Sequence, residues 1–285
     1  MGDGQWSTGH VSPGVPEFQP VLDVVEPVRQ RRLTVLLRLL LLLPHFVVLF
    51  FLSVVAVVMV VVGWFSALVL GRLPEPVFRF LAGRLGYQTR VLANEMLLVD
   101  RYPPFSFRPP GDYPVRVEVR PTELNRLAVL FRLLLMIPAL VVQALAVTGW
   151  FSLSFVWWLV TLILGRMPKP LFEATAATLR YQMRFEAYAS MLTPAYPKGL
   201  FGDDGLLVVP YGTGSSTRPL IMSRAGGMFV VLFLVLGLAS SVTWSTTSYD
   251  DEPSDTYRLH KEPAGNGGRD PGRPGASPPH DVDST

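Results

Sequence analysis

Three long apolar runs dominate the pattern of hydrophobic and polar positions, at residues 33–70, 127–164 and 226–244. Runs longer than about 18 residues are typical of membrane helices rather than of a protein core. Within the first two runs, residues 45–70 and 139–164 carry no charge. Each of these segments would extend over about 39 Å as a helix, which is enough to cross a bilayer with tilt. We therefore expect spans at 45–70, 139–164 and 226–244.

Shorter patterns flank the first two runs. Residues 113–119 alternate apolar and polar side chains, which predicts a half-buried strand, and residues 21–26 repeat this pattern more weakly. Residues 33–43 form an apolar stretch with basic residues near its start, and it leads to Pro44. Because proline ends or kinks helices, we expect a short interfacial helix that stops there. After each long run, as at residues 78–96, apolar positions recur at helical spacing, which predicts an amphipathic helix.

The chain contains the same unit twice. A shift of 94 residues places Pro20–Phe107 on Pro114–Phe201 without a gap, and more than thirty of the paired positions are identical. The sequence therefore predicts a mainly α-helical integral membrane protein built from a tandem duplicated unit: short strand, interfacial helix, transmembrane helix and amphipathic helix. A third transmembrane helix and a disordered C-terminal tail follow. The expected segments are a disordered leader at 1–19, repeats at 20–107 and 112–202, a third transmembrane helix at 226–244 and a disordered acidic, Pro- and Gly-rich tail at 248–285.

The charge pattern leaves the topology of each repeat open. Residues 248–285 carry eight acids and four bases, and the remainder of the chain is basic. Arg218 and Arg224 precede the last run, and acids follow it, so the positive-inside rule places the tail outside the cytoplasm. One span per repeat would put the ten arginines between the first two spans on the outer face, against that rule. A re-entrant hairpin in residues 33–70 avoids the conflict but would need a turn in lipid, so we favour one span per repeat.

The motifs of both repeats resemble the bacterial family DUF4389. The resemblance rests on the strand opening Tyr113-Pro114-Val115, on an Arg- and Leu-rich helix that runs into Leu43-Pro44-His45, on a Gly-Arg-x-Pro turn after each apolar run and on Asp100–Phe105. It covers roughly residues 18–202. It implies a multi-pass protein of the cell membrane and brings no catalytic residues.

The residue inventory offers little for catalysis. There is no cysteine, and His45 is the one histidine outside the predicted disorder. No carboxylate lies inside a predicted span, and we find no phosphate loop, nucleophile motif or metal-ligand spacing. We expect no enzyme activity, catalytic residue, cofactor, metal or nucleic-acid partner.

Duplicated arginines are the remaining candidates for a site. Juxtamembrane arginines attract anionic lipids, so we predict lipid contacts at six positions: Arg38, Arg72, Arg90, Arg132, Arg166 and Arg184. The favoured function is a non-enzymatic envelope scaffold that binds lipid or a membrane-protein partner. The alternative is a small channel or transporter with its path at the repeat interface, for which polar lining at mid-membrane depth would be the discriminating feature.

Overall fold

The computed structural model describes residues 19–24, 29–202, 217 and 220–250. The predicted disordered leader, up to residue 18, and the tail beyond residue 250 lie outside these ranges. Residues 1–244 form one compact unit and residues 245–285 a second. All contacts given below lie within the first unit.

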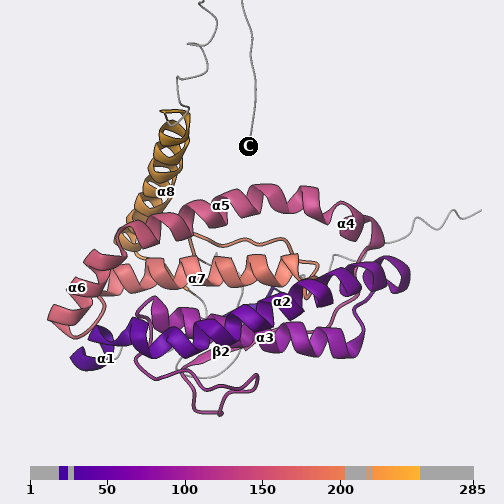
Figure 1. Cartoon of the computed structure of the whole chain (residues 1–285), viewed down its shortest axis with the longest axis horizontal. Helices are drawn as coiled ribbons and strands as arrows, with labels where there is room; N and C mark the ends of the chain where they lie inside the picture. The colour runs from indigo at the N-terminus through magenta and orange to yellow at the C-terminus, as the bar shows by residue number, and fades with distance from the viewer. Residues whose placement is uncertain (1–18, 25–28, 203–216, 218–219, 251–285) are drawn as a thin grey trace, which may run out of the picture. The chain divides into compact units, whose positions relative to one another are not determined.

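Each copy folds into a strand followed by three or four helices (Figure 1). The first copy contains β1 (Val21–Val24), α1 (Arg32–Leu36), α2 (Arg38–Leu70) and α3 (Glu75–Glu95). The second contains β2 (Val115–Glu118), α4 (Arg126–Leu130), α5 (Arg132–Ser152), α6 (Ser154–Leu164) and α7 (Lys169–Ala189), and α8 (Arg224–Asp250) follows. The predicted helical class, the duplication and the two strands are therefore present. The last helix runs to residue 250, slightly into the segment expected to be disordered.

The predicted helix end at Pro44 is wrong. The break lies at Leu37, between α1 and α2. Helix α2 is 33 residues long and contains Pro44. Proline removes a single helical hydrogen bond close to the start of α2, and the Tyr102 hydroxyl donates to the Leu41 carbonyl oxygen in the preceding turn (3.2 Å). Residues 38–70 contain no reversal, so the hairpin alternative is not formed there.

The second copy differs because its long helix is interrupted. Leu153 separates α5 from α6, so residues 139–164 are not the single helix that we expected. The Ser152 hydroxyl bonds back to the Thr148 carbonyl oxygen at 2.9 Å, which is a known cause of helix bending. Both α2 and α6 end at a glycine with positive φ, Gly71 (71°) and Gly165 (67°), a conformation that glycine adopts without steric cost.

The two copies pack around a pseudo-two-fold axis. The Gln30 N–H donates to the Gly165 carbonyl oxygen, and the Leu124 N–H donates to the Gly71 carbonyl oxygen, both at 2.8 Å. The two bonds join equivalent positions, because the shift of 94 residues places Gln30 on Leu124 and Gly71 on Gly165. The Trp64 indole likewise donates to the Val129 carbonyl oxygen at 3.2 Å, and that of Trp158 to Val35 at 2.9 Å. These indoles therefore join the copies to each other.

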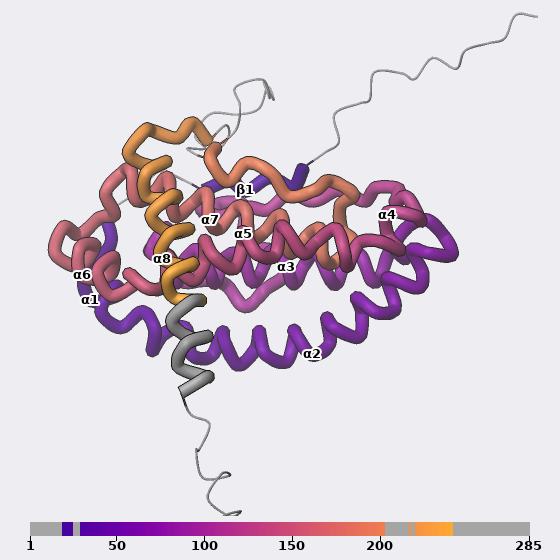
Figure 2. The backbone as a smooth tube through the Cα atoms, turned by 90° about the horizontal axis from the view of Figure 1, so that it is seen from above, coloured from indigo at the N-terminus to yellow at the C-terminus, as the bar shows by residue number. Residues whose placement is uncertain are grey.

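The helices form layers behind a two-stranded sheet. β1 pairs antiparallel with β2, and Val21 faces Glu118. The sheet packs on α3 and α7, which contact each other, while α2 packs on α3 and α5 on α7. Figure 2 shows α2 at one edge and β1 at the opposite edge, with α3 and α7 between them.

The outermost helices expose aliphatic side chains. In α2 a narrow stripe that includes Leu42, Ala56, Gly63 and Ala67 is buried, and most of the other side chains are exposed. By length and composition, three helices could cross a membrane: residues 38–70, 132–152 and the 224–241 part of α8. That they do so remains a prediction at this point.

Helix α8 crosses α5 at two glycines. A Cβ atom added at Gly149 would lie 1.7 Å from the Phe233 carbonyl oxygen, and one added at Gly237 would lie 2.1 Å from that of Leu145. Only glycine permits so close a backbone approach.

We expect Gly149→Ala to destabilise the protein by more than about 2 kcal/mol, because the added methyl group meets backbone rather than a movable side chain. Thermal unfolding in detergent measures this change. Gly111→Ala, where a Cβ atom would meet no other atom within 4 Å, is the matched control and should unfold like the parent. Equal melting temperatures for the two variants would contradict the close crossing.

Candidate functional site

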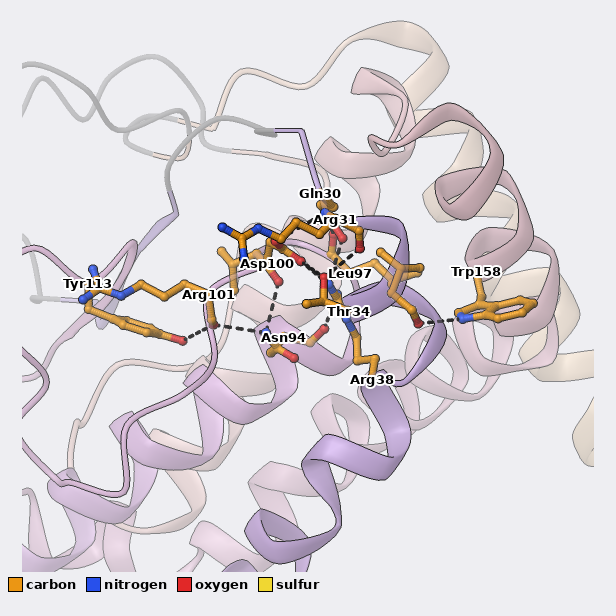
Figure 3. Close-up of polar contacts among 12 residues, drawn as sticks. Gln30, Arg31, Thr34, Arg38, Asn94, Leu97, Asp100, Arg101, Tyr113 and Trp158 are labelled. Atoms are coloured by element: carbon orange, nitrogen blue, oxygen red, sulfur yellow. Dashed lines mark hydrogen bonds and ion pairs between the residues drawn. The ribbon is translucent and has the colours of Figure 1, made fainter.

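A polar network surrounds the Arg38 guanidinium group at the start of α2 (Figure 3). The Arg38 side chain is 4% exposed. It donates to the Asn94 carbonyl oxygen at 2.6 Å and to the Gln30 side-chain oxygen at 2.8 Å, and it lies 3.5 Å from Asp100. The Gln30 amide in turn donates to the Leu97 carbonyl oxygen. Arg38 therefore binds the end of α3 rather than the surface.

Asp100 and Asn94 extend this network toward the strand. Asp100 accepts hydrogen bonds from the Arg31 N–H (3.3 Å) and the Thr34 hydroxyl (2.5 Å). The Asn94 side-chain amide donates to the carbonyl oxygens of Val99 and Arg101, both at 3.1 Å. These bonds fix the segment that leaves α3.

Two positions after the ends of α3 and α7, the chain has a left-handed residue other than glycine. Leu97 has a φ of 64° and Met191, its pseudo-equivalent, a φ of 59°. Bulky residues adopt this conformation only where their surroundings enforce it, at a cost of about 1 kcal/mol or more. Arg132, the equivalent of Arg38, donates to the Thr193 carbonyl oxygen and lies 4.1 Å from the centroid of the Tyr188 ring. In both copies an arginine thus holds the strained end of a helix.

Arg90 and Arg184 are also buried. Arg90 donates to the Ser106 carbonyl oxygen, and Arg184 donates to those of Lys198 (2.7 Å) and Pro20 (3.2 Å). Four of the six arginines predicted to contact lipid, Arg38, Arg90, Arg132 and Arg184, therefore lie inside the protein with backbone partners. Their role as buried donors to backbone carbonyl oxygens could not be predicted from the sequence, because carbonyl acceptors have no sequence signature.

Arg72 and Arg166 are exposed. Each directly follows the glycine that ends the long helix of its copy, beside exposed Leu70 or Leu164. A Cβ atom at Gly71 would lie 3.7 Å from Arg126 Nε, and Arg32 donates to the Ile163 carbonyl oxygen at 3.3 Å. An arginine from the other copy therefore approaches each position.

We call Arg72 with Arg126, and Arg166 with Arg32, the terminal arginine pairs. The sequence analysis missed Arg32 and Arg126, although they too coincide under the shift of 94 residues. Their identity in the two copies was a sequence signal that they could belong to a site. Their position beside the other copy, which makes them candidates for that site, is visible only in the structure.

A polar cluster lies between α3 and α7 at the repeat interface. Arg84 and Glu186 form an ion pair at 3.3 Å, the Gln88 amide donates to Glu186 at 3.0 Å, and Arg84 also donates to the Ser53 hydroxyl at 3.0 Å. The shift of 94 residues places Arg84 on Thr178 and Glu186 on Leu92. Neither charged residue is repeated at its equivalent position in the other copy. A comparison of the two repeats therefore could not reveal the cluster.

An apolar cavity of about 380 Å³ opens between the α1–α2 junction and the α5–α6 junction. Its lining includes Leu39, Trp150 and Phe155, together with the carboxyl group of Glu95. Burial raises the pKa of Glu95 to about 7. The carboxyl group is therefore about half neutral at neutral pH.

His45 is held by packing and hydrogen-bonding contacts with neighbouring aromatic side chains. Its Nδ1 lies 2.6 Å from the Tyr87 hydroxyl, and its ring stacks on Phe105 at 4.0 Å between centroids. Among the residues that the structure describes, no three or more His, Cys, Asp or Glu side chains are grouped so that they could hold a metal ion.

We expect Arg38→Gln to lower the free energy of unfolding by at least about 2 kcal/mol, because it leaves buried acceptors without their donor. Arg72→Gln should change it by less than about 0.5 kcal/mol, as is usual for an exposed position. Thermal unfolding of both variants in one detergent tests this. An Arg38→Gln protein as stable as Arg72→Gln would show that the network contributes no stability.

The pKa of Glu95 predicts a pH dependence of stability. Because the folded state raises this pKa from an ordinary 4.5 to about 7, folding favours the protonated group. The resulting stabilisation is full below about pH 4.5 and is lost as the pH rises through about 7. The melting temperature of the parent should therefore fall over this window by more than that of Glu95→Gln. Parallel profiles for the two proteins would contradict the buried neutral form.

The family described as "Domain of unknown function (DUF4389)" matches the chain twice, at residues 32–106 and 126–200. The two matches begin at α1 and α4, and they include every arginine discussed above from Arg32 to Arg184. No curated protein and no solved structure matches the chain. The two matches together cover more than half of the chain, so the protein belongs to the DUF4389 family and carries two tandem copies of its domain.

Proposed function

We propose that this protein is a non-enzymatic scaffold of the cell membrane that binds anionic lipid at the terminal arginine pairs. The observation that carries the proposal is the position of these pairs. Arg72 and Arg166 are the two predicted lipid contacts that remain exposed, and each lies where a lipid-facing helix ends.

The apolar surface supports a membrane location. Side chains such as Phe50 (64% exposed), Val57 (65%), Leu133 (67%) and Phe155 (70%) would face water in a soluble monomer. Soluble monomers rarely expose contiguous apolar patches larger than a few hundred Å². Lipid chains remove this cost, and the bilayer is the first partner of the protein in this proposal.

The chemistry of the terminal arginine pairs matches a lipid phosphate. A guanidinium group binds phosphate oxygens in a bidentate manner. Arg72 and Arg166 follow exposed Leu70 and Leu164, and the side chains of Arg126 and Arg32 from the other copy approach the same two helix ends. A phospholipid presents the complementary combination, an anionic headgroup attached to apolar chains. Binding there would also link the two copies, which makes the same surface suitable for a membrane-protein partner with acidic residues.

The proposed orientation follows from α8. Arg224 begins this helix and Asp250 ends it, so the duplicated part faces the cytoplasm and the tail lies outside. The proposal includes no enzyme activity, because the buried arginines, His45 and Asp100 all have structural partners.

We expect a variant with Arg32, Arg72, Arg126 and Arg166 all changed to Gln to bind phosphatidylglycerol at least about fivefold more weakly, since each arginine contributes up to about 1 kcal/mol. The measurement is the rise in melting temperature when phosphatidylglycerol is titrated into protein in neutral detergent. Arg108→Gln, at an exposed arginine in the loop before β2, is the control for the loss of an arginine outside these pairs. Equal lipid-dependent shifts for the variant, the control and the parent would sink the lipid-binding proposal.

The polar cluster of Arg84, Gln88 and Glu186 favours a second candidate, a channel or transporter with its path at the repeat interface. These residues supply polar groups at the interface between the two repeats. Solute movement into liposomes that contain the protein, and its loss in Glu186→Gln, would favour this candidate over the scaffold.

A further inference from the structure

We propose that α2, α5 and α6 lie along the plane of the bilayer within the cytoplasmic leaflet, and that α8 alone crosses it. The inference rests on the proposed membrane location. It replaces the one-span-per-repeat topology that the sequence favours. It places the pseudo-two-fold axis along the bilayer normal.

The length of α2 is the first argument. Its 33 residues extend over about 50 Å, whereas the hydrocarbon core of a bilayer is about 30 Å thick. Its exposed aliphatic side chains continue from Leu39 (66% exposed) to Val69 (70%). A crossing helix would leave apolar side chains outside the hydrocarbon at one or both ends, but a helix in the plane keeps all of them at one depth.

The polar cluster at the repeat interface is the second argument. Arg84 donates to the Ser53 hydroxyl, and Ser53 is close to the midpoint of α2. If α2 crossed the bilayer, the ion pair of Arg84 with Glu186 would lie at the bilayer midplane, where charges are expensive. With α2 in the plane, the pair lies on the cytoplasmic side of α2.

The sheet makes the same point. It packs on α3 and α7, on the opposite side of these helices from α2 (Figure 2). Its strand β2 has four residues, and these include exposed Arg116 and half-buried Glu118. A short open sheet cannot face lipid, because its edges leave backbone groups without partners. An in-plane orientation places the sheet outside the hydrocarbon.

Helix α8 supplies the direction of the bilayer normal. Near its start, Gly226 lies beside Glu173 of α7, and further along Phe233 and Gly237 meet Gly149 and Leu145 of α5. The helix therefore passes from the α7 layer through the α5 layer. Figure 2 shows it running steeply across α5 and α7.

The spacing along α8 gives the depth of α5. From Gly226, where the apolar run begins, to Phe233 is seven residues, or about 10 Å. From Phe233 to Trp244, where the run ends, is eleven residues, or about 16 Å. The axis of α5 thus lies about 10 Å below the cytoplasmic edge of the hydrocarbon, within a leaflet whose apolar half is about 15 Å thick. About 20 Å of hydrocarbon then remain, and α8 covers this distance because its 17 residues from Phe233 to its end at Asp250 extend over about 26 Å.

The arrangement also removes the conflict over charge. The ten arginines between the first two predicted spans, residues 45–70 and 139–164, would be outside with one span per repeat, whereas here they all lie on the cytoplasmic side. The terminal arginine pairs follow the ends of α2 and α6 at the turns toward α3 and α7, where their side chains can extend to the headgroups.

Spin labels on single cysteines measure depth directly, and the native chain contains no cysteine that would interfere. Leu40, Val54 and Val69 lie on one face of α2, close to four turns apart, and each is more than half exposed. In liposomes we expect the depths of these three labels to agree within about 5 Å, which is half of a helix diameter. Labels at Met228 and Val235 of α8 are the matched control and should differ by about 10 Å.

A profile in which the Val54 label lies deep and the labels at Leu40 and Val69 reach the headgroups would overturn the proposal. Water-exposed labels at all positions, α8 included, would instead show that the proposed membrane location itself is wrong.

Labelling of intact cells with an impermeant maleimide gives an independent answer about sidedness. Glu75→Cys and Lys169→Cys are pseudo-equivalent and exposed, and one span per repeat places them on opposite sides of the membrane. We expect both to react only after permeabilisation, while Ser277→Cys in the tail reacts in intact cells. Reaction of Glu75→Cys but not of Lys169→Cys in intact cells would establish the crossing topology and refute ours.

Discussion

Arginine guanidinium groups that bind backbone carbonyl oxygens hold this structure together. A helix that ends inside an apolar protein leaves carbonyl oxygens that water cannot reach, and each of them needs a donor. Arg38 and Arg132 meet this need after α3 and α7, and Arg90 and Arg184 do so for the segments that return to the sheet. The guanidinium group suits the task because it offers five donors in a fixed plane. With those donors in place, Leu97 and Met191 keep their left-handed conformations and the chain can reverse within a few residues.

The same constraint explains why the two copies are alike at some positions and differ at others. Trp64 and Trp158 are identical because each indole makes the same bond to the other copy, and Gly71 and Gly165 are identical because both take a positive φ. Positions near the axis or beside α8 are free to differ. Glu186 replaces the equivalent of Leu92 where a single ion pair lies at the interface, and Gly149 replaces the equivalent of Val55 where α8 crosses.

The sequence predicted the parts of the fold that depend on local pattern. The duplication, the alternation in β2, the apolar runs and the glycines that end α2 and α6 are all legible in single residues and their spacing. The continuity of α2 through Pro44 was not, because proline removes only one hydrogen bond of a helix that packs along α3 for much of its length. The burial of four arginines also depends on distant partners. For the candidate site, the exposed positions Arg72 and Arg166 came from the sequence, whereas Arg32 and Arg126 gained their role only from the packing of one copy against the other.

The reciprocal bonds between the copies have a consequence for how such a protein can arise. A solitary unit has the Trp64-type donor and the Val129-type acceptor on different surfaces, so it can satisfy them only in a homodimer with a twin. Fusion of two genes turns that bimolecular encounter into an intramolecular one, at an effective concentration in the millimolar range for a short connection. Folding then no longer depends on expression level, and either half can mutate without its change appearing twice.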